Sequence, residues 1–190
     1  MRMKKALPVF VCSILCFVLA IRYFRPDFSW FAEASINDTG NMADMSQPLP
    51  HAVMPTVDGN CVDFESYRGK VLLINFWTTW CSGCQSEISE LIKLQKEFQG
   101  KGFTLVAVAM DVEGEESVKT FVESERFAVD GTSTAINFPV LMGHDELARK
   151  MGFEGGLPVS VLVTRDSKEV RILRGPMLAK EVVHAIKHLL

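Results

Sequence analysis

The sequence has few cysteines and no concentration of basic charge. Five cysteines occur in 190 residues, whereas small secreted domains held together by disulfides are shorter and richer in cysteine. Lysine and arginine are scattered, and the formal net charge is −3 with a pI near 5.8, so no nucleic-acid partner is expected. The main part of the chain has no internal repeat and no low-complexity tract. These absences exclude a disulfide-stapled scaffold, a repeat protein and a nucleic-acid-binding protein.

The first 26 residues form a segment of their own. An uncharged apolar run, residues 6–21, has basic residues on both sides. It is shorter than the roughly 20 residues that usually cross a bilayer, but flanking aromatic and arginine side chains can extend its reach. A cleaved secretory signal is the alternative, and Ala32-Glu33-Ala34 is its best cleavage site. That site lies far beyond the apolar run, so residues 1–26 are predicted to be a membrane anchor rather than a cleaved signal.

The remaining chain divides into a linker and one domain. Residues 27–47 are polar and small without a sustained period (DTGNMADMSQ), which is typical of a flexible tether. Residues 48–190 are of ordinary length for a single domain. Within this domain, buried-type apolar runs alternate with amphipathic stretches. The pattern predicts hairpins at 52–64 and 159–173, strands at 71–76, 103–110 and 138–142, and helices at about 82–100, 115–124, 145–151 and 178–190.

This order of elements predicts an α/β fold. Strand 71–76, the helix that follows it and strand 103–110 form a strand-helix-strand unit, which is expected to be a right-handed parallel crossover. The final hairpin adds antiparallel strands. We therefore expect a central mixed sheet with helices packed against it.

Cys81 and Cys84 are the most informative residues of the sequence. Cys81 follows the predicted central strand and precedes a helix, where exposed backbone N–H groups and the helix dipole stabilise a thiolate. Cys84 lies one helical turn later and is expected to be less exposed. Cys81 is therefore the predicted nucleophile, and Cys84 the thiol that resolves a mixed disulfide.

A zinc site is the alternative interpretation of this cysteine pair, and it needs a second pair of ligands. His184 and His188 have i, i+4 spacing but share the polar face of the last helix with lysines, while His51 and His144 are isolated. A solvated helix face is the simpler interpretation of the two C-terminal histidines. No metal and no cofactor is therefore expected.

The segment from Asn75 to Cys84 (NFWTTWCSGC) resembles the active-site segment of thioredoxins. It is closer to the extracytoplasmic branch, the TlpA, ResA-like and cytochrome c maturation thioredoxins, in which an anchor carries a domain with an extra N-terminal hairpin. Residues 48–64 fit that hairpin, and the likeness covers residues 48–190. The resemblance implies a thioredoxin fold and a redox-active disulfide between Cys81 and Cys84.

Three further parts of the sequence match this branch. Gly156-Leu157-Pro158 resembles the family's cis-proline loop, so Trp80, Leu157 and Pro158 are implied to contact a bound polypeptide; a trans turn is the alternative for Pro158. Glu87 matches a glutamate near the active site of ResA-like proteins. It is implied to carry a proton to or from Cys84, with a raised pKa if partly shielded, and the alternative is a solvent-facing helix charge. Asn75 stands where cytoplasmic thioredoxins carry a buried acid.

The sequence also departs from the family pattern. Ser89 replaces a proline that is usual after the second cysteine, and the turn at residues 166–168 lacks its usual glycine. The connector Phe127 to Asn137 is expected to alter the rim near the cysteines, which leaves the substrate open. Cys61 has no partner in sequence and is expected to be a buried hairpin residue.

The expected function is thiol-disulfide exchange outside the cytoplasm, on the periplasmic or extracytoplasmic side. Ser82 and Gly83 carry no charge that would strongly favour a thiolate, so a reductant is favoured over an oxidant. The resemblance implies protein disulfide substrates, such as apocytochrome c or copper-site proteins, and a membrane electron-donor thiol reductase. A peroxiredoxin-like thiol peroxidase, suggested by Thr78 three residues before Cys81, and a copper or zinc carrier remain as alternatives.

Overall fold

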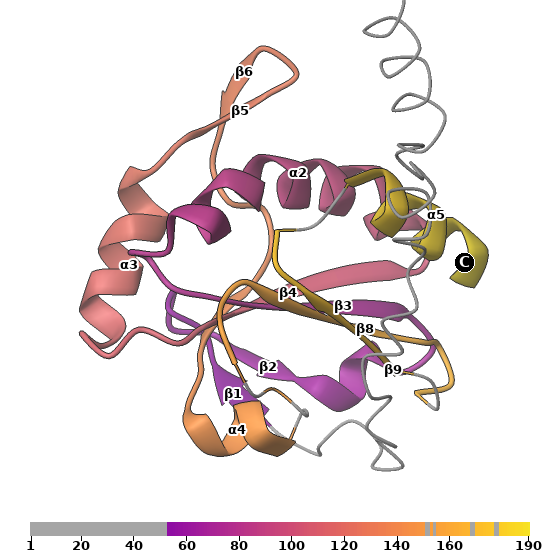
Figure 1. The fold of residues 1–190 in the computed structure, drawn as a ribbon, viewed down its shortest axis with the longest axis horizontal. Coiled ribbons are helices and arrows are strands. Elements are labelled where there is room, and N and C mark those ends of the chain that lie inside the picture. The colour runs from indigo at the N-terminus through magenta and orange to yellow at the C-terminus, as the bar shows by residue number, and fades with distance from the viewer. Residues whose placement is uncertain (1–52, 151–152, 154, 168–169, 177–178) are drawn as a thin grey trace, which may run out of the picture. The chain divides into compact units, whose positions relative to one another are not determined.

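The structure is a computed structural model that describes residues 53–150, 153, 155–167, 170–176 and 179–190. Its centre is a five-stranded sheet with the strand order β7-β4-β3-β8-β9 (Figure 1). The strands are β3 (Val71–Trp77), β4 (Phe103–Ala109), β7 (Val140–Met142), β8 (Val159–Val163) and β9 (Val170–Arg174). β3 pairs parallel with β4 and antiparallel with β8, so the sheet is mixed, as predicted.

β3 and β4 occupy the middle of the sheet because both are apolar at all but one position. Every residue of either strand is buried, which requires cover on both faces. The chain passes from β3 to β4 through α2 (Ser82–Phe98), and a crossover of this kind is what a parallel pair needs. The predicted strand-helix-strand unit is therefore present.

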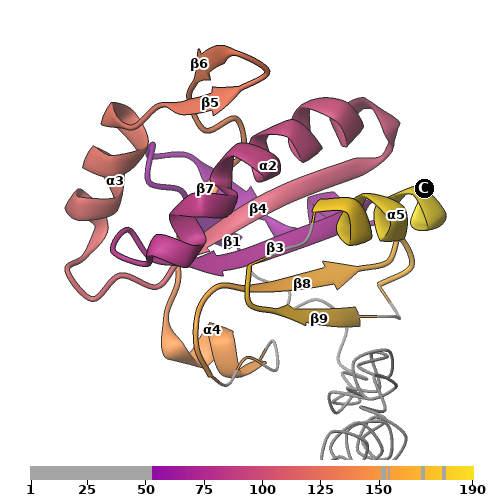
Figure 2. The same ribbon diagram turned by 45° about the horizontal axis from the view of Figure 1, so that its top comes forward.

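Successive side chains of β3 point to opposite faces of the sheet and so enter two separate cores. Leu73 and Trp77 belong to a core completed by α2, α3 (Glu115–Ser124) and α5 (Ala179–Leu189). Leu72 and Phe76 belong to the other core, completed by β1 (Val53–Pro55), β2 (Cys61–Asp63) and α4 (Asp145–Lys150). Figure 2 shows α2 and α5 on one side of the sheet and α4 on the other.

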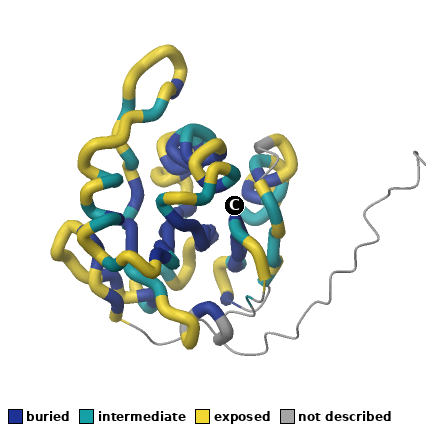
Figure 3. Tube along the Cα trace, turned by 60° about the vertical axis from the view of Figure 1, so that its left-hand side comes forward, coloured by how far each residue is buried: buried dark blue, intermediate teal, exposed yellow. Residues whose placement is uncertain are grey.

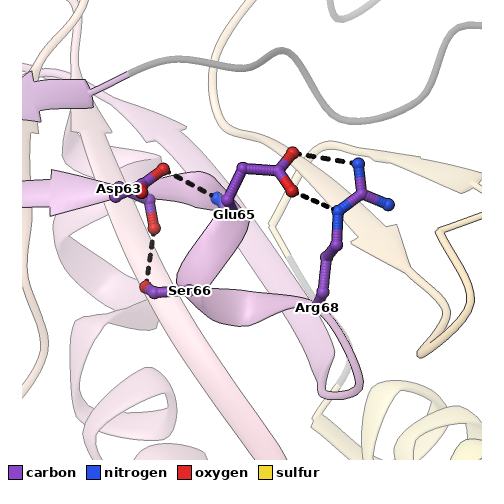
Figure 4. A network of polar contacts seen from close by, with 4 residues as sticks. All are labelled: Asp63, Glu65, Ser66 and Arg68. Atoms are coloured by element: carbon purple, nitrogen blue, oxygen red, sulfur yellow. Dashed lines mark hydrogen bonds and ion pairs between the residues drawn. The ribbon is translucent and has the colours of Figure 1, made fainter.

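The predicted N-terminal hairpin is present and is locked to the sheet. β1 and β2 pair antiparallel, and Val57 N donates to Val140 O at the sheet edge (2.9 Å). A short helical turn, η2 (Phe64–Tyr67), follows directly. Asp63 caps this turn by accepting from Glu65 N (2.9 Å), and Arg68 forms an ion pair with Glu65 (Figure 4). These local contacts stabilise the turn that precedes β3.

Cys61 corrects one expectation from the sequence, because its side chain is exposed rather than buried. β2 has an alternating pattern in which Val62 points into the core while Cys61 and Asp63 face outward. Val62 supplies the apolar contact of this strand, and the thiol lies on the opposite side. Of the three cysteines among the described residues, Cys61 is the one outside the disulfide.

The connector between α3 and β7 contains a hairpin that was not predicted. β5 (Phe127–Val129) pairs antiparallel with β6 (Thr132–Thr134), and the turn residues Asp130 and Gly131 both have positive φ (50° and 77°). Asp-Gly is the favoured dipeptide for such a two-residue turn. The β5–β6 hairpin projects from the domain (Figure 1), and Figure 3 shows that the tip of this hairpin is exposed while the central strands are buried.

Residues 1–26 and 27–47, predicted as an anchor and a tether, lie outside the described residues. Within the described part of the chain, no helix combines the length and apolar character needed to cross a bilayer.

Candidate active site

Cys81 and Cys84 are joined by a disulfide at the start of α2, with 5.2 Å between their Cα atoms. β3 ends at Trp77, and Cys81 is the N-cap residue of the helix. The Cys84 backbone N–H donates to Cys81 Sγ (3.1 Å). In the reduced protein the same N–H and the positive end of the helix dipole would stabilise a thiolate on Cys81.

The two sulfurs differ in how far they are exposed. Cys81 is half-buried, whereas Cys84 is only 1% exposed and belongs to the core under α2. A partner protein can therefore reach Cys81, and Cys84 is placed to attack only a sulfur already attached to Cys81. Cys81 as nucleophile and Cys84 as resolving thiol stay predictions.

The Leu157-Pro158 peptide bond is cis and lies beside the cysteine pair. A Cβ atom on Gly83 would stand 3.5 Å from Pro158 Cδ and 3.8 Å from Pro176 Cγ. Gly175 N donates to Pro158 O (2.9 Å), which fixes the loop to the start of the β9–α5 connection. Pro158 is buried and Leu157 is half-buried, whereas Trp80, the third residue for which the family resemblance implies partner contact, is largely exposed (63%).

A buried polar cluster lies next to the disulfide, on the α2 side of the sheet. The Asn75 side-chain amide donates to Glu87 Oε1 (2.8 Å) and to Ser160 Oγ (3.0 Å). All three residues are at most 4% exposed. Glu87 is therefore not a solvent-facing helix charge, which was the alternative interpretation of this residue. The structure brings its carboxyl into the core one helical turn after Cys84.

A family comparison settles the class of this protein. Residues 45–171 match the model of the AhpC/TSA family, a span that includes the cysteine pair, Glu87 and the cis-proline. The chain belongs to the AhpC/TSA family. It is similar to thiol-disulfide oxidoreductase ResA of Bacillus subtilis, with 24% identity over 190 residues, covering all of this chain and 96% of the relative. A ResA of Geobacillus thermodenitrificans is 25% identical over 169 residues (89% and 88%).

Solved structures agree with this assignment. A thiol:disulfide interchange protein of the thioredoxin family from Chlorobium tepidum is 29% identical, with a TM-score of 0.64 over 76% of this chain and 96% of that one. The exposed lipoprotein thioredoxin Etrx1 of Streptococcus pneumoniae shares the fold at 22% identity, with a TM-score of 0.62 over 73% and 98%. This AhpC/TSA protein therefore has the thioredoxin fold and is a thiol-disulfide oxidoreductase.

Sequence reasoning missed two polar residues of the site. Ser160 is the single polar residue of the apolar strand β8 and lies opposite Asn75 in the β3–β8 register. Asp111 follows the buried strand β4 and accepts hydrogen bonds from Thr79. A lone polar residue inside or just after a buried strand was the available signal. Its partner could not be read from the sequence because both pairings depend on strand register.

The alternative metal-binding interpretation gains no support from the described residues, where no group of three or more His, Cys, Asp or Glu side chains could hold an ion. The rings of His184 and His188 stack edge to face at 4.7 Å on the exposed side of α5. His144 is also exposed, and His51 lies outside the described residues.

Proposed function

We propose that this AhpC/TSA protein is a membrane-tethered reductase of protein disulfides outside the cytoplasm. The observation that carries the proposal is the unequal cysteine pair: a half-buried Cys81 at a helix N-terminus and a buried Cys84, both beside a cis-proline. Such a pair suits stepwise dithiol-disulfide exchange with another polypeptide.

The reaction starts from the dithiol form. The Cys81 thiolate attacks one sulfur of the partner's disulfide, which forms a mixed disulfide and releases the other partner sulfur as a thiolate. The Cys84 thiolate then attacks Cys81 Sγ, which forms the Cys81–Cys84 bond and releases the second partner sulfur as a thiolate, which then takes up a proton. Two electrons pass from the cysteine pair to the partner. A membrane thiol reductase would return the pair to the dithiol form by the same exchange in reverse.

Glu87 is proposed to hold the proton that leaves Cys84 during the second step. Its carboxyl lies in the core one turn beyond that cysteine and accepts from Asn75 (2.8 Å). Asn75 cannot titrate, so it orients the carboxyl without competing for the proton. If this role is correct, Glu87→Gln slows resolution of the mixed disulfide and flattens its dependence on pH, while the first attack by Cys81 keeps its rate.

The reducing direction is favoured by the residues between the cysteines. Ser82 and Gly83 bring neither a histidine nor a charge that would strongly stabilise the thiolate, and strong oxidants depend on such stabilisation of their reduced form. Apocytochrome c and copper-site proteins are the partner classes that we propose, because each must present reduced cysteines to its haem or metal. Residues 1–26 would hold the domain on the extracytoplasmic side of the membrane.

The reduction potential of the Cys81 and Cys84 pair tests the direction of electron flow. The purified chain is equilibrated in glutathione or dithiothreitol buffers, and the two redox forms are separated after alkylation. We expect a potential at or below about −270 mV, the value of thioredoxin. A potential near about −120 mV would make the protein an oxidant that installs disulfides.

The exchange reaction is tested with a disulfide-containing protein substrate. Cys84→Ser should accumulate a mixed disulfide through Cys81, and Cys81→Ser should form none. Cys61→Ser is the matched control, because it removes an exposed thiol that lies outside the pair, and it should turn over like the parent chain. Rapid consumption of peroxide by a chain that leaves protein disulfides intact would instead favour the thiol peroxidase alternative.

A further inference from the structure

The ends of β3 and β4 stay connected beyond the last paired residues of the sheet. In the parallel register Trp77 lies opposite Ala109, and Met110 N donates to Trp77 O (2.8 Å). Thr79 lies two residues after Trp77, Asp111 lies two residues after Ala109, and these two residues are hydrogen-bonded to each other. The segment that leads into Cys81 therefore leaves the sheet alongside the segment that follows β4.

The carboxylate of Asp111 holds this segment through hydrogen bonds from Thr79. It is 8% exposed and accepts from Thr79 N at 3.0 and 3.1 Å, and also from the Thr79 hydroxyl. Gln85, on the first turn of α2, donates its side-chain amide to Thr79 O. Thr79 is thus held at its N–H, its hydroxyl and its carbonyl, two residues before Cys81.

Each partner of this contact is followed by a large exposed apolar side chain. Trp80 follows Thr79 and is 63% exposed, and Val112 follows Asp111 and is 89% exposed. Among the described residues, the other large apolar side chain exposed to this degree is Val53, on β1. Exposing an apolar side chain forgoes the free energy of burying it, and here each of two such side chains directly follows one partner of the Thr79–Asp111 contact.

We propose that Trp80 and Val112 form one apolar contact surface for the partner polypeptide, and that Asp111 is the positioning residue that holds this surface beside Cys81. The proposal rests on the proposed function, since it concerns how a disulfide-bearing polypeptide is recognised. Asp111 itself acts through Thr79 and does not take part in the exchange of electrons.

The charges around this surface define the kind of partner. Glu113, Glu115 and Glu116 follow Val112 and are all exposed, and the last two begin α3. A polypeptide that contacts Val112 therefore approaches acidic side chains. The occupant that fits is a segment with an apolar side chain next to its disulfide cysteine and a lysine or arginine close by, whereas an acidic segment would be repelled.

The test uses the full chain in its dithiol form and pairs of synthetic disulfide peptides. One pair differs only in Leu or Ser beside the cysteine, and a second pair only in Lys or Glu two positions away. For the parent chain we expect a KM about tenfold lower for the Leu peptide, with similar kcat. We also expect a lower KM for the Lys peptide, by a margin that shrinks as salt is raised.

Variants then assign the preference to residues. Val112→Ser and Asp111→Ala should reduce the Leu-over-Ser preference to less than about twofold, chiefly through KM. Asp111→Asn restores an oxygen that accepts from Thr79 N and should recover most of the preference. Val53→Ser is the matched control, because it removes another largely exposed valine, which lies on β1, and it should keep the preference of the parent chain.

The outcomes separate this inference from the proposed function. If the parent chain reduces a small aromatic disulfide but shows equal KM for the Leu and Ser peptides, the contact surface is refuted while the reductase function stands. The same holds if Val112→Ser keeps the full preference, a measurement that does not depend on whether Asp111→Ala folds. If the dithiol chain reduces neither the peptides nor the small disulfide, the proposed function itself fails.

Discussion

The buried hydrogen bonds of Asn75 lead to a quantitative prediction for Asn75→Ala. The substitution removes a hydrogen bond to Glu87 (2.8 Å) and a second bond to Ser160 (3.0 Å). Loss of a donor to a buried polar group costs about 1–3 kcal/mol, and the space left by the amide adds about 1 kcal/mol. The free energy of unfolding should therefore fall by about 2–4 kcal/mol. For a chain of this length, that corresponds to a Tm lower by roughly 8 °C.

Asn137→Ala is the matched control for this substitution. Its amide donates to Ile92 O (3.1 Å), but the residue is exposed, so water can replace the lost bond. We expect a cost below about 1 kcal/mol. Both variants are unfolded in urea with the Cys81–Cys84 disulfide intact, so that the redox state does not differ between samples.

A double-mutant cycle shows whether the stability lost in Asn75→Ala comes from the contact with Glu87. The free energies of unfolding of Asn75→Ala, Glu87→Ala and the double variant are compared with that of the parent chain. We expect a coupling energy of about 1–2 kcal/mol, because the two side chains are in direct contact. A stability loss for Asn75→Ala no greater than that for Asn137→Ala, or simple additivity of Asn75→Ala and Glu87→Ala, would show that these hydrogen bonds do not stabilise the fold as expected.

Three further predictions concern other parts of the domain. Gly143→Ala should lower the free energy of unfolding by about 1–3 kcal/mol in urea titration, since its Cβ would stand 2.5 Å from Met110 Sδ. A hydrogen bond from Thr56 lowers the pKa of Asp58 below its ordinary value of 3.8. The stabilisation that this bond gives to the fold is present above pH 3.8 and is lost as the pH falls through the pKa of the folded protein. In acid titration, the free energy of unfolding of Thr56→Val should therefore depend less on pH in this range. Cys61 is exposed, so iodoacetamide should label it in the native, unreduced chain, as peptide mass spectrometry will show; protection would contradict this placement.

Local pattern was sufficient to predict most of the fold because the main elements have strong signals. The apolar runs of β3 and β4 and the helical spacing after Cys81 each identify one element without reference to the rest of the chain. The predicted burial of Cys61 was wrong because the local pattern was ambiguous. Alternation in a three-residue strand has two possible phases, and the inward position of Val62 decides the phase only once β2 has docked on the sheet.

The hairpin β5–β6 shows a different limit of sequence reasoning. Its Asp-Gly turn is a strong hairpin signal, but the flanking residues of β6, Thr132 to Thr134, are polar and mostly exposed, so they lack the apolar alternation that identifies a strand. β5 packs against α2, which lies far from it in the sequence, and Phe127 also contacts Phe121 of α3 with 6.3 Å between ring centres. The sequence did not show that β5 and α2 lie close together in space.

In the candidate site, too, the features that depend on local sequence were predictable and the long-range contacts were not. The order of Cys81, Cys84 and Glu87 along one helix follows from its period, so their proximity was predictable. The contacts that hold these residues come from elsewhere: Ser160 through the β3–β8 pairing, and Asp111 through the β3–β4 pairing. Both supports converge on β3 because its inward-facing Asn75 and the segment after Trp77 lie at the end of the strand that leads into the helix. A shift of the β3–β4 register by one residue would turn the buried side chains of a strand to the opposite core. The packing of the two cores therefore fixes the register that places Asp111 beside Thr79.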